Sequence, residues 1–120
     1  MANSAVTPTL DIQMLAHLEK TVGHEIIQFV IQQFLEYAPQ QLQALQNSLK
    51  NSDLETLSQQ AHQFKGESLQ IGANQLGSLC DQLENFAEAG QLEAASAHLV
   101  KLEPEILRLK AALSQVNNDD

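Results

Sequence analysis

Three residues whose types suit phosphoryl chemistry lie close together in the middle of the chain: His62, Lys65 and Gly66. If this stretch is helical, residues three or four apart share one face, so an imidazole, an ammonium and a position without a side chain lie side by side. A neutral imidazole nitrogen can attack phosphorus at physiological pH, and an ammonium can bind phosphoryl oxygens. We therefore predict that His62 accepts a phosphoryl group and that Lys65 stabilises it.

Gly66 and Leu69 indicate that a second protein approaches this histidine. Glycine inside a helix costs about 1 kcal/mol relative to alanine, so its presence one turn after His62 requires a reason. Without a side chain at Gly66, the reacting group of a partner can reach the imidazole. Leu69 adds an apolar side chain to the same surface, which suits docking. We predict that Gly66 provides access to His62 and that Leu69 provides a docking contact.

The apolar pattern predicts that these side chains are carried by a helix that follows the polar turn at residues 51–53 and ends at Gly72. Residues suited to a core recur at three- and four-residue steps, namely Leu54, Leu57, Ala61, Phe64, Ser68 and Ile71. At about 100° per residue they form one buried stripe, and His62 lies on the neighbouring strip. Phe64 is predicted to support the site from the core.

The segment from Ala61 to Ala73 resembles the signature of the histidine-containing phosphotransfer (HPt) domains of phosphorelays. Nine residues stand where the family pattern expects them, namely Ala61, His62, Phe64, Lys65, Gly66, Ser68, Ile71, Gly72 and Ala73. Glu67 departs from the pattern, because that position usually holds a small residue. The order and lengths of the expected helices are also similar to those of the family, from about Leu10 to Leu113.

The resemblance implies a phosphorelay intermediate. Such a protein accepts a phosphoryl group from the aspartyl-phosphate of a response-regulator receiver domain, holds it on a histidine, and passes it to the aspartate of another receiver. The implied partners are receiver domains and a hybrid sensor histidine kinase. The receiver brings Mg²⁺, so no cofactor is expected on this chain. The sequence contains neither of the glycine-rich loops that bind nucleotide phosphates, so we expect a phosphohistidine carrier without ATP-dependent kinase activity and not an enzyme.

Glu84 has an open role. In some family members a glutamine of the following helix holds the histidine ring, and counting along the sequence puts Glu84 at that position. A carboxylate can accept an imidazole N–H, but it repels a bound phosphoryl group. Two alternatives to phosphotransfer remain. One is a helical interaction module that docks on signalling partners without transferring phosphate, and the other is an acid–base enzyme that uses His62 and Glu84.

Two helices are expected before the one that carries His62. A short helix begins at the N-cap Asp11, and a long helix runs from about Gly23 to Lys50. Pro39 interrupts the long helix without ending its apolar pattern, so we expect a bend there. The folded domain is expected to span residues 10–114, between a disordered lead-in at 1–9 and a disordered tail at 115–120.

Two more helices are expected after the site. Asn74 is predicted to cap a helix that stops at Gly90, and the last helix is predicted to run from Leu92 to Leu113 with a bend at Pro104. No segment alternates with period two over the length of a strand, and the turns are short, so neighbouring helices are antiparallel. We therefore predict an all-α fold: an up-down antiparallel four-helix bundle with a short additional N-terminal helix that caps one end.

Charge and composition narrow the partners and the compartment. Six basic residues against 15 acidic ones give a formal net charge of −9, which argues against nucleic acid and anionic membrane as partners. The single cysteine, Cys80, excludes an intrachain disulfide and is expected to be a small buried residue. No signal peptide, membrane-spanning run or His/Cys cluster with metal-ligand spacing is visible. We expect a cytoplasmic monomer without a metal site.

Overall fold

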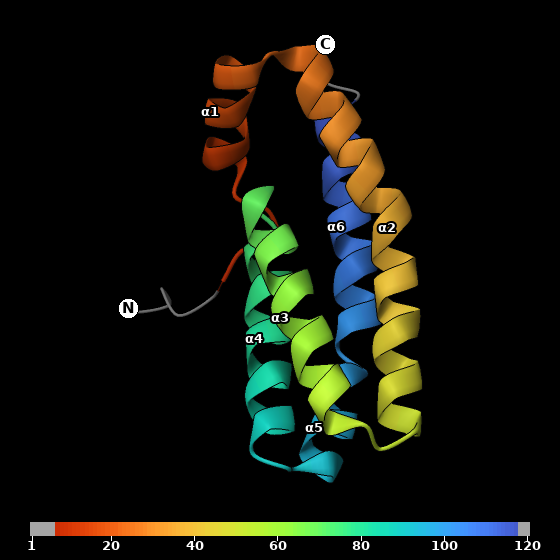
Figure 1. The fold of residues 1–120 in the computed structure, drawn as a ribbon. Coiled ribbons are helices and arrows are strands. Elements are labelled where there is room, and N and C mark those ends of the chain that lie inside the picture. Colours follow the sequence, from red (N-terminus) through yellow and green to blue (C-terminus); the bar gives the residue numbers. More distant parts are fainter. Residues whose placement is uncertain (1–6, 118–120) are drawn as a thin grey trace, which may run out of the picture.

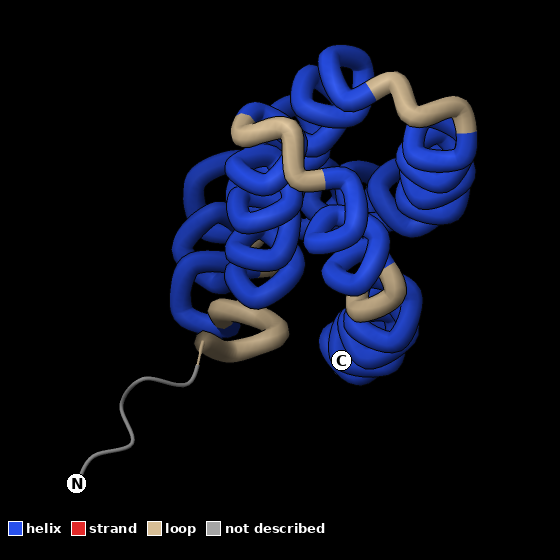
Figure 2. The backbone as a smooth tube through the Cα atoms, turned by 90° about the horizontal axis from the view of Figure 1, so that it is seen from below, coloured by secondary structure: helices blue, strands red, loops and turns tan. Residues whose placement is uncertain are grey.

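The computed structural model describes residues 7–117, and every regular element within them is a helix. Helices α1 to α6 span Ile12–Val22, His24–Lys50, Leu54–Gln70, Asn74–Glu88, Leu92–Leu99 and Leu102–Asn117. Figure 2 shows short loops between these helices and no strand in the described part of the chain. The all-α prediction is therefore confirmed. Most of the lead-in and the last part of the tail, at residues 1–6 and 118–120, lie outside the described residues.

The long helices pack around a mainly aliphatic core. In Figure 1, α2, α3, α4 and α6 run alongside one another, with α5 at one end and α1 at the other. Each of these four long helices contributes fully buried side chains, among them Ile31, Phe64, Leu83 and Leu109. The rings of Phe34 and Phe64 stack between α2 and α3 with their centroids 6.0 Å apart. None of the helices within residues 7–117 has the length and apolar character needed to cross a membrane.

The segment before α1 is attached to the turn between α3 and α4. The N–H of Asp11 donates to the carbonyl of Gly72 at 2.7 Å, and the N–H of Gln75 donates to the carbonyl of Pro8 at 2.9 Å. Pro8 belongs to the lead-in that was expected to be disordered, yet its carbonyl has a fixed partner. These two backbone bonds hold the start of α1 at the same end of the bundle as the end of α3.

Two predicted N-caps have different outcomes. Asp11 caps α1 as predicted, because its Oδ1 accepts the N–H of Met14 at 3.0 Å. The prediction for Asn74 is wrong, since Ala73 is the N-cap of α4 and Asn74 is its first residue. The side-chain amide of Asn74 instead donates to Oδ2 of Asp11 at 3.4 Å. This tertiary partner is invisible in the local sequence, where Asn74 has the form of a cap.

Pro39 lies inside α2 and does not end it. The helix continues through 27 residues, as predicted, and Figure 1 shows its axis changing direction part-way along its length. Proline lacks the N–H that would bond to the carbonyl of Leu35, and its ring crowds that carbonyl, which accounts for a bend in this region. Ala38 and Leu42 on either side of the proline are both buried. The apolar stripe therefore stays in phase across Pro39.

Three large apolar residues near the start of α2, namely Ile26, Phe29 and Val30, are exposed. Helix α2 has 27 residues against 17 in α3, a difference of roughly 15 Å at 1.5 Å per residue. Its first turns extend beyond α3 in Figure 1, so only the narrower stripe of Ile27 and Ile31 is covered by neighbours. Helical periodicity in the sequence gives the direction of an apolar stripe but not its width.

The predicted last helix is in fact two helices, α5 and α6, separated by Val100 and Lys101. Pro104 lies in the first turn of α6, where its missing N–H costs no hydrogen bond because the first four N–H groups of a helix have no intrahelical acceptor. In one continuous helix the same proline would lose a bond and clash with the carbonyl of Val100. The chain therefore breaks before Pro104, and the prediction of a single bent helix is wrong.

A buried histidine lies between α4 and α5. The His98 side chain is almost fully covered, its Nε2–H donates to the carbonyl of Leu79 at 3.0 Å, and its ring meets Phe86 edge-on. Burial disfavours the charged imidazolium and lowers the pKa of His98 from its ordinary value, although the bond to Leu79 opposes this shift. His98 is therefore a neutral component of the core.

We expect acid to destabilise the fold through His98. Its pKa is lower in the folded chain than in the unfolded chain, so its contribution to stability is complete above the unfolded pKa of about 6.5 and is lost as the pH falls from there toward the folded pKa. His98→Leu should therefore weaken the pH dependence of the melting temperature between about pH 7.5 and 5.5, measured by circular dichroism. If acidification lowered the melting temperatures of wild type and His98→Leu equally, His98 would not be the group that makes the fold sensitive to acid.

Candidate functional site

Helix α3 carries the predicted site on its outer face. Asp53 caps the start of α3 by accepting the N–H of Thr56 at 3.1 Å. The inner face consists of Leu57, Ala61, Phe64 and Ser68, all of them buried. Gly72 follows the last turn with a φ of 79°, the left-handed conformation expected of a glycine that ends a helix. At about 100° per residue, this stripe leaves His62 and Gly66 on the solvent side.

The imidazole of His62 is exposed and held by one carboxylate. Its side chain is 66% accessible, and its Nδ1 lies 3.0 Å from Oε2 of Glu84 on α4, whose own side chain is 13% accessible. A carboxylate oxygen accepts hydrogen bonds, so we assign the ring proton to Nδ1. The other ring nitrogen, Nε2, then has a free lone pair. This contact puts Glu84, the residue with an open role, against the predicted phosphoryl acceptor.

Lys65 is engaged by the same carboxylate. Its Nζ lies 3.1 Å from Oε1 of Glu84 and 3.1 Å from Oδ1 of Asp81. The hydrogen bonds to Asp81 and then to Glu84 raise the pKa of Lys65 above its ordinary value. Glu84 therefore uses one oxygen on His62 and the other on Lys65. Asp81 was not predicted from the sequence, because only the packing of α4 on α3 brings it to the lysine.

Gly66 and Leu69 occupy the surface next to His62. Beyond its chain neighbours and the backbone of α3, a Cβ placed on Gly66 would meet no atom within 4 Å, so no packing contact requires glycine there. Leu69 is exposed, as predicted, but it also lies over Gly77 of α4, where an added Cβ would come within 2.6 Å of Leu69 Cδ2. The two helical glycines thus differ: Gly77 makes room for a side chain of this chain, and Gly66 leaves open surface.

Glu67, the departure from the family pattern, lies about 140° around α3 from His62 at 100° per residue. Gln63 connects it to α2: its Nε2 is 3.4 Å from Oε2 of Glu67 and 3.3 Å from the hydroxyl of Tyr37. Burial and then the Glu67 carboxylate raise the pKa of Tyr37. Glu67 is therefore part of a polar contact between α3 and α2, away from the imidazole.

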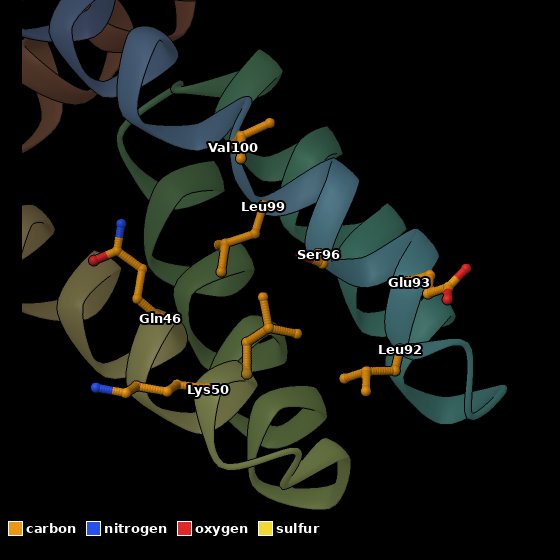
Figure 3. Close-up of a pocket in the computed structure, with 8 residues that line it drawn as sticks. Gln46, Lys50, Leu92, Glu93, Ser96, Leu99 and Val100 are labelled. Atoms are coloured by element: carbon orange, nitrogen blue, oxygen red, sulfur yellow. The ribbon is translucent and has the colours of Figure 1, made fainter.

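The surface beside His62 is only slightly hollowed. A hollow of about 320 Å³ is lined by Ser58, Gln59, His62, Glu84 and Glu88. A larger hollow of about 470 Å³ lies between α2 and α5, where Leu49, Leu92, Leu99 and Val100 form much of its lining (Figure 3), and it contains none of the predicted site residues. A reaction at His62 would therefore take place on an open surface and not inside an enclosed pocket.

Other reactive side chains are less suited to chemistry. Cys80 is fully buried, as predicted, and burial raises the pKa of its thiol to about 12, so it is a poor nucleophile. Within residues 7–117, no group of three or more His, Cys, Asp or Glu side chains is arranged to hold a metal ion. Phe64 is buried beneath the site and stacks on Phe34, the position predicted for its support.

Comparisons with known proteins identify relatives with the same arrangement of helices. The profile of the Hpt domain family matches residues 30–119. The structure is similar to histidine-containing phosphotransfer protein B (HptB) from Pseudomonas aeruginosa, with a TM-score of 0.86 and 29% identity, covering 92% of this chain and 95% of that chain. It is also similar to the histidine-containing phosphotransfer protein MtHPt2 from Medicago truncatula, with a TM-score of 0.78 and 26% identity, covering 89% and 76% of the two chains. A search of curated proteins found no match.

The family match includes all of α3 and α4, and so it includes both His62 and the Glu84 carboxylate that contacts its ring. The resemblance that was based on residues 61–73 thus extends over most of the chain. Hpt proteins are phosphocarriers rather than kinases, and their domains interact with receiver domains and histidine kinases in two-component systems. The chain belongs to the Hpt domain family.

Proposed function

We propose that this protein is a phosphorelay intermediate that accepts a phosphoryl group on His62 from the aspartyl-phosphate of one receiver domain and passes it to the aspartate of another. A hybrid sensor histidine kinase is the proposed source of the first receiver. The observation that carries this proposal is the exposed imidazole of His62, with Nδ1 held 3.0 Å from Glu84 and the open surface of Gly66 one turn further along α3.

The proposed transfer is a displacement at phosphorus. The lone pair of His62 Nε2 forms the new N–P bond while the P–O bond to the receiver's aspartate breaks, and the aspartate leaves as a carboxylate. The ring keeps its Nδ1 proton, and Glu84 stabilises the positive charge that develops on the imidazole. Lys65 binds phosphoryl oxygens, and Mg²⁺ held by the receiver neutralises their charge during transfer. Transfer to the second receiver reverses the same bonds.

The proposed docking surface combines Gly66 and Leu69 of α3 with Phe29 and Val30 of α2. All except Gly66 are apolar and exposed. Val30 and Gln70 line the same hollow of about 290 Å³ between α2 and α3, and Leu69 is the residue before Gln70 in α3. An interface with an apolar centre near an open glycine suits a receiver whose phosphoaspartate must reach His62.

In this proposal, α2, α3, α4 and α6 form an antiparallel four-helix bundle that keeps the docking surface rigid, and α1 caps one end. The protein acts as a cytoplasmic monomer that meets its receivers in turn. The alternative, an interaction module without phosphotransfer, would use the same docking surface. It gives no reason for an exposed imidazole whose ring is oriented by a carboxylate, so we favour the phosphocarrier.

His62→Gln should abolish phosphoryl uptake and leave the melting temperature nearly unchanged, because an exposed side chain is replaced by a polar one. The measurement is incubation with a radiolabelled phosphorylated receiver domain, followed by a test for label on this chain that is labile in acid and stable in alkali. His17→Gln, at an exposed position of α1, is the control and should label normally. Label retained in His62→Gln would exclude His62 as the acceptor.

Gly66→Gln should preserve or raise thermal stability, since an added Cβ finds open space there and helix propensity improves. It should slow phosphotransfer from a receiver by roughly 10- to 100-fold, because a displacement of about 1 Å between reacting groups costs that much. Thermal melting followed by circular dichroism measures the stability, and rapid-quench assays measure the transfer rate. A normal transfer rate in Gly66→Gln would show that open access at this position is not needed.

Lys65→Ala should behave differently from Gly66→Gln. It removes a cation that binds the phosphoryl group but leaves the docking surface open, so receiver binding should stay near the wild-type value. Transfer should slow, or phosphorylated His62 should decay faster, because the phosphoryl charge loses its counter-charge. The two variants should therefore differ in a receiver-binding titration, in which Gly66→Gln binds weakly and Lys65→Ala binds like wild type. Weak receiver binding by Lys65→Ala would place the lysine in the docking contact instead.

A further inference from the structure

Lys65, the one cation with a proposed role at His62, is shared by two carboxylates in the resting site. Its Nζ is 3.1 Å from Asp81 and 3.1 Å from Glu84, and Glu84 in turn is 3.0 Å from His62. We propose that Asp81 is a positioning residue that competes with the phosphoryl group for Lys65 and thereby shortens the lifetime of phosphorylated His62. The proposal rests on the phosphocarrier function and adds a residue that controls how firmly the phosphoryl group is held.

The geometry of two packed helices creates this competition. His62 and Lys65 are three residues apart on α3, and Asp81 and Glu84 are three residues apart on α4, so each pair shares a face. The two faces meet across the contact between α3 and α4. As a result Lys65 bridges both carboxylates, while the imidazole contacts only Glu84.

The two carboxylates differ in how readily they can release the lysine. Asp81 is 50% accessible, whereas Glu84 is 13% accessible and also holds His62. Water can solvate an exposed carboxylate when its cation leaves, so breaking the contact with Asp81 costs little. A largely covered carboxylate such as Glu84 is solvated less well when it loses its cation. When a phosphoryl group arrives on Nε2, Lys65 therefore leaves Asp81 and keeps Glu84.

The small free-energy cost of breaking the Asp81 contact is subtracted from the stabilisation that Lys65 gives to the phosphorylated state. An ammonium has three donors, and the resting site uses two of them on carboxylates. Each conformer in which Lys65 bonds to Asp81 is one in which fewer donors face the phosphoryl oxygens. Asp81 thus keeps phosphohistidine less stable than the lysine alone would make it, which favours onward transfer over storage.

The test compares the decay of phosphohistidine in wild type and in variants that are labelled chemically with potassium phosphoramidate, a donor that needs no protein partner. Asp81→Asn should lengthen the half-life of phosphorylated His62, followed by ³¹P NMR, by about two- to fivefold, the range expected of an exposed ion pair. Glu88→Gln is the matched control, because it removes one negative charge from the same helix and its carboxylate bonds to Ser58. An equal increase in both variants would mean a general charge effect and would overturn the proposal.

The double variant Lys65→Ala/Asp81→Asn tests whether Asp81 acts through the lysine. With Lys65 absent, Asp81→Asn should leave the half-life unchanged, so the two substitutions are not additive. A full two- to fivefold increase in the Lys65→Ala background would show that Asp81 acts on the phosphoryl group directly and would overturn the positioning role.

A measurement without phosphate separates failure of this proposal from failure of the proposed function. The pKa of Lys65, followed by NMR of its ε-methylene group, should be lower in Asp81→Asn than in wild type and unchanged in Glu88→Gln. If a phosphorylated receiver domain transfers no label to His62 of the wild-type protein, the phosphocarrier function is overturned together with this proposal. Normal labelling, with an unchanged Lys65 pKa and half-life in Asp81→Asn, would overturn this proposal alone.

Discussion

The contact on which the site depends is the carboxylate of Glu84, which reaches from α4 to two side chains of α3. One oxygen fixes the imidazole of His62 and the other binds the ammonium of Lys65. This arrangement requires α3 and α4 to pack closely, and Gly77 permits it by leaving room for Leu69 between the helices. Because Glu84 is largely covered, its orientation is fixed by packing as well as by its two partners. The packing of α3 and α4 thus determines which ring nitrogen of the exposed His62 carries the proton.

A carboxylate next to a phosphoryl acceptor carries a cost that an amide would not. Glu84 stabilises the protonated Nδ1 and any positive charge on the ring, but it repels the phosphoryl group that Nε2 would carry. Lys65 offsets this repulsion only as far as its other bonds allow. The balance suits an intermediate, which must accept a group and also release it. A site that held phosphate more firmly would be better at storage and worse at transfer.

Much of this architecture is predictable from the sequence because α-helices have a regular period. The apolar stripe of α3 predicts which residues are buried, and so it also predicts that His62 and Gly66 face outward. Contacts that depend on packing were not predicted: Asp81 meets Lys65, and His98 is buried, only after α4 has found its neighbours. Pro104 could lie inside one bent helix or in the first turn of a new one, and the local sequence pattern alone leaves both open.

The charge distribution explains why this site would depend on a partner. The chain has a formal net charge of −9, and the lysine at the site is already bound to two carboxylates. Free phosphate would therefore find little uncompensated positive charge beside His62, and its own desolvation would not be repaid. A receiver brings the phosphoryl group already bonded to an aspartate and close to a cation, so charge and reacting atom arrive together. In the proposed relay, an open glycine and an apolar surface would then be sufficient on this chain, because selectivity would reside in docking and not in a phosphate pocket.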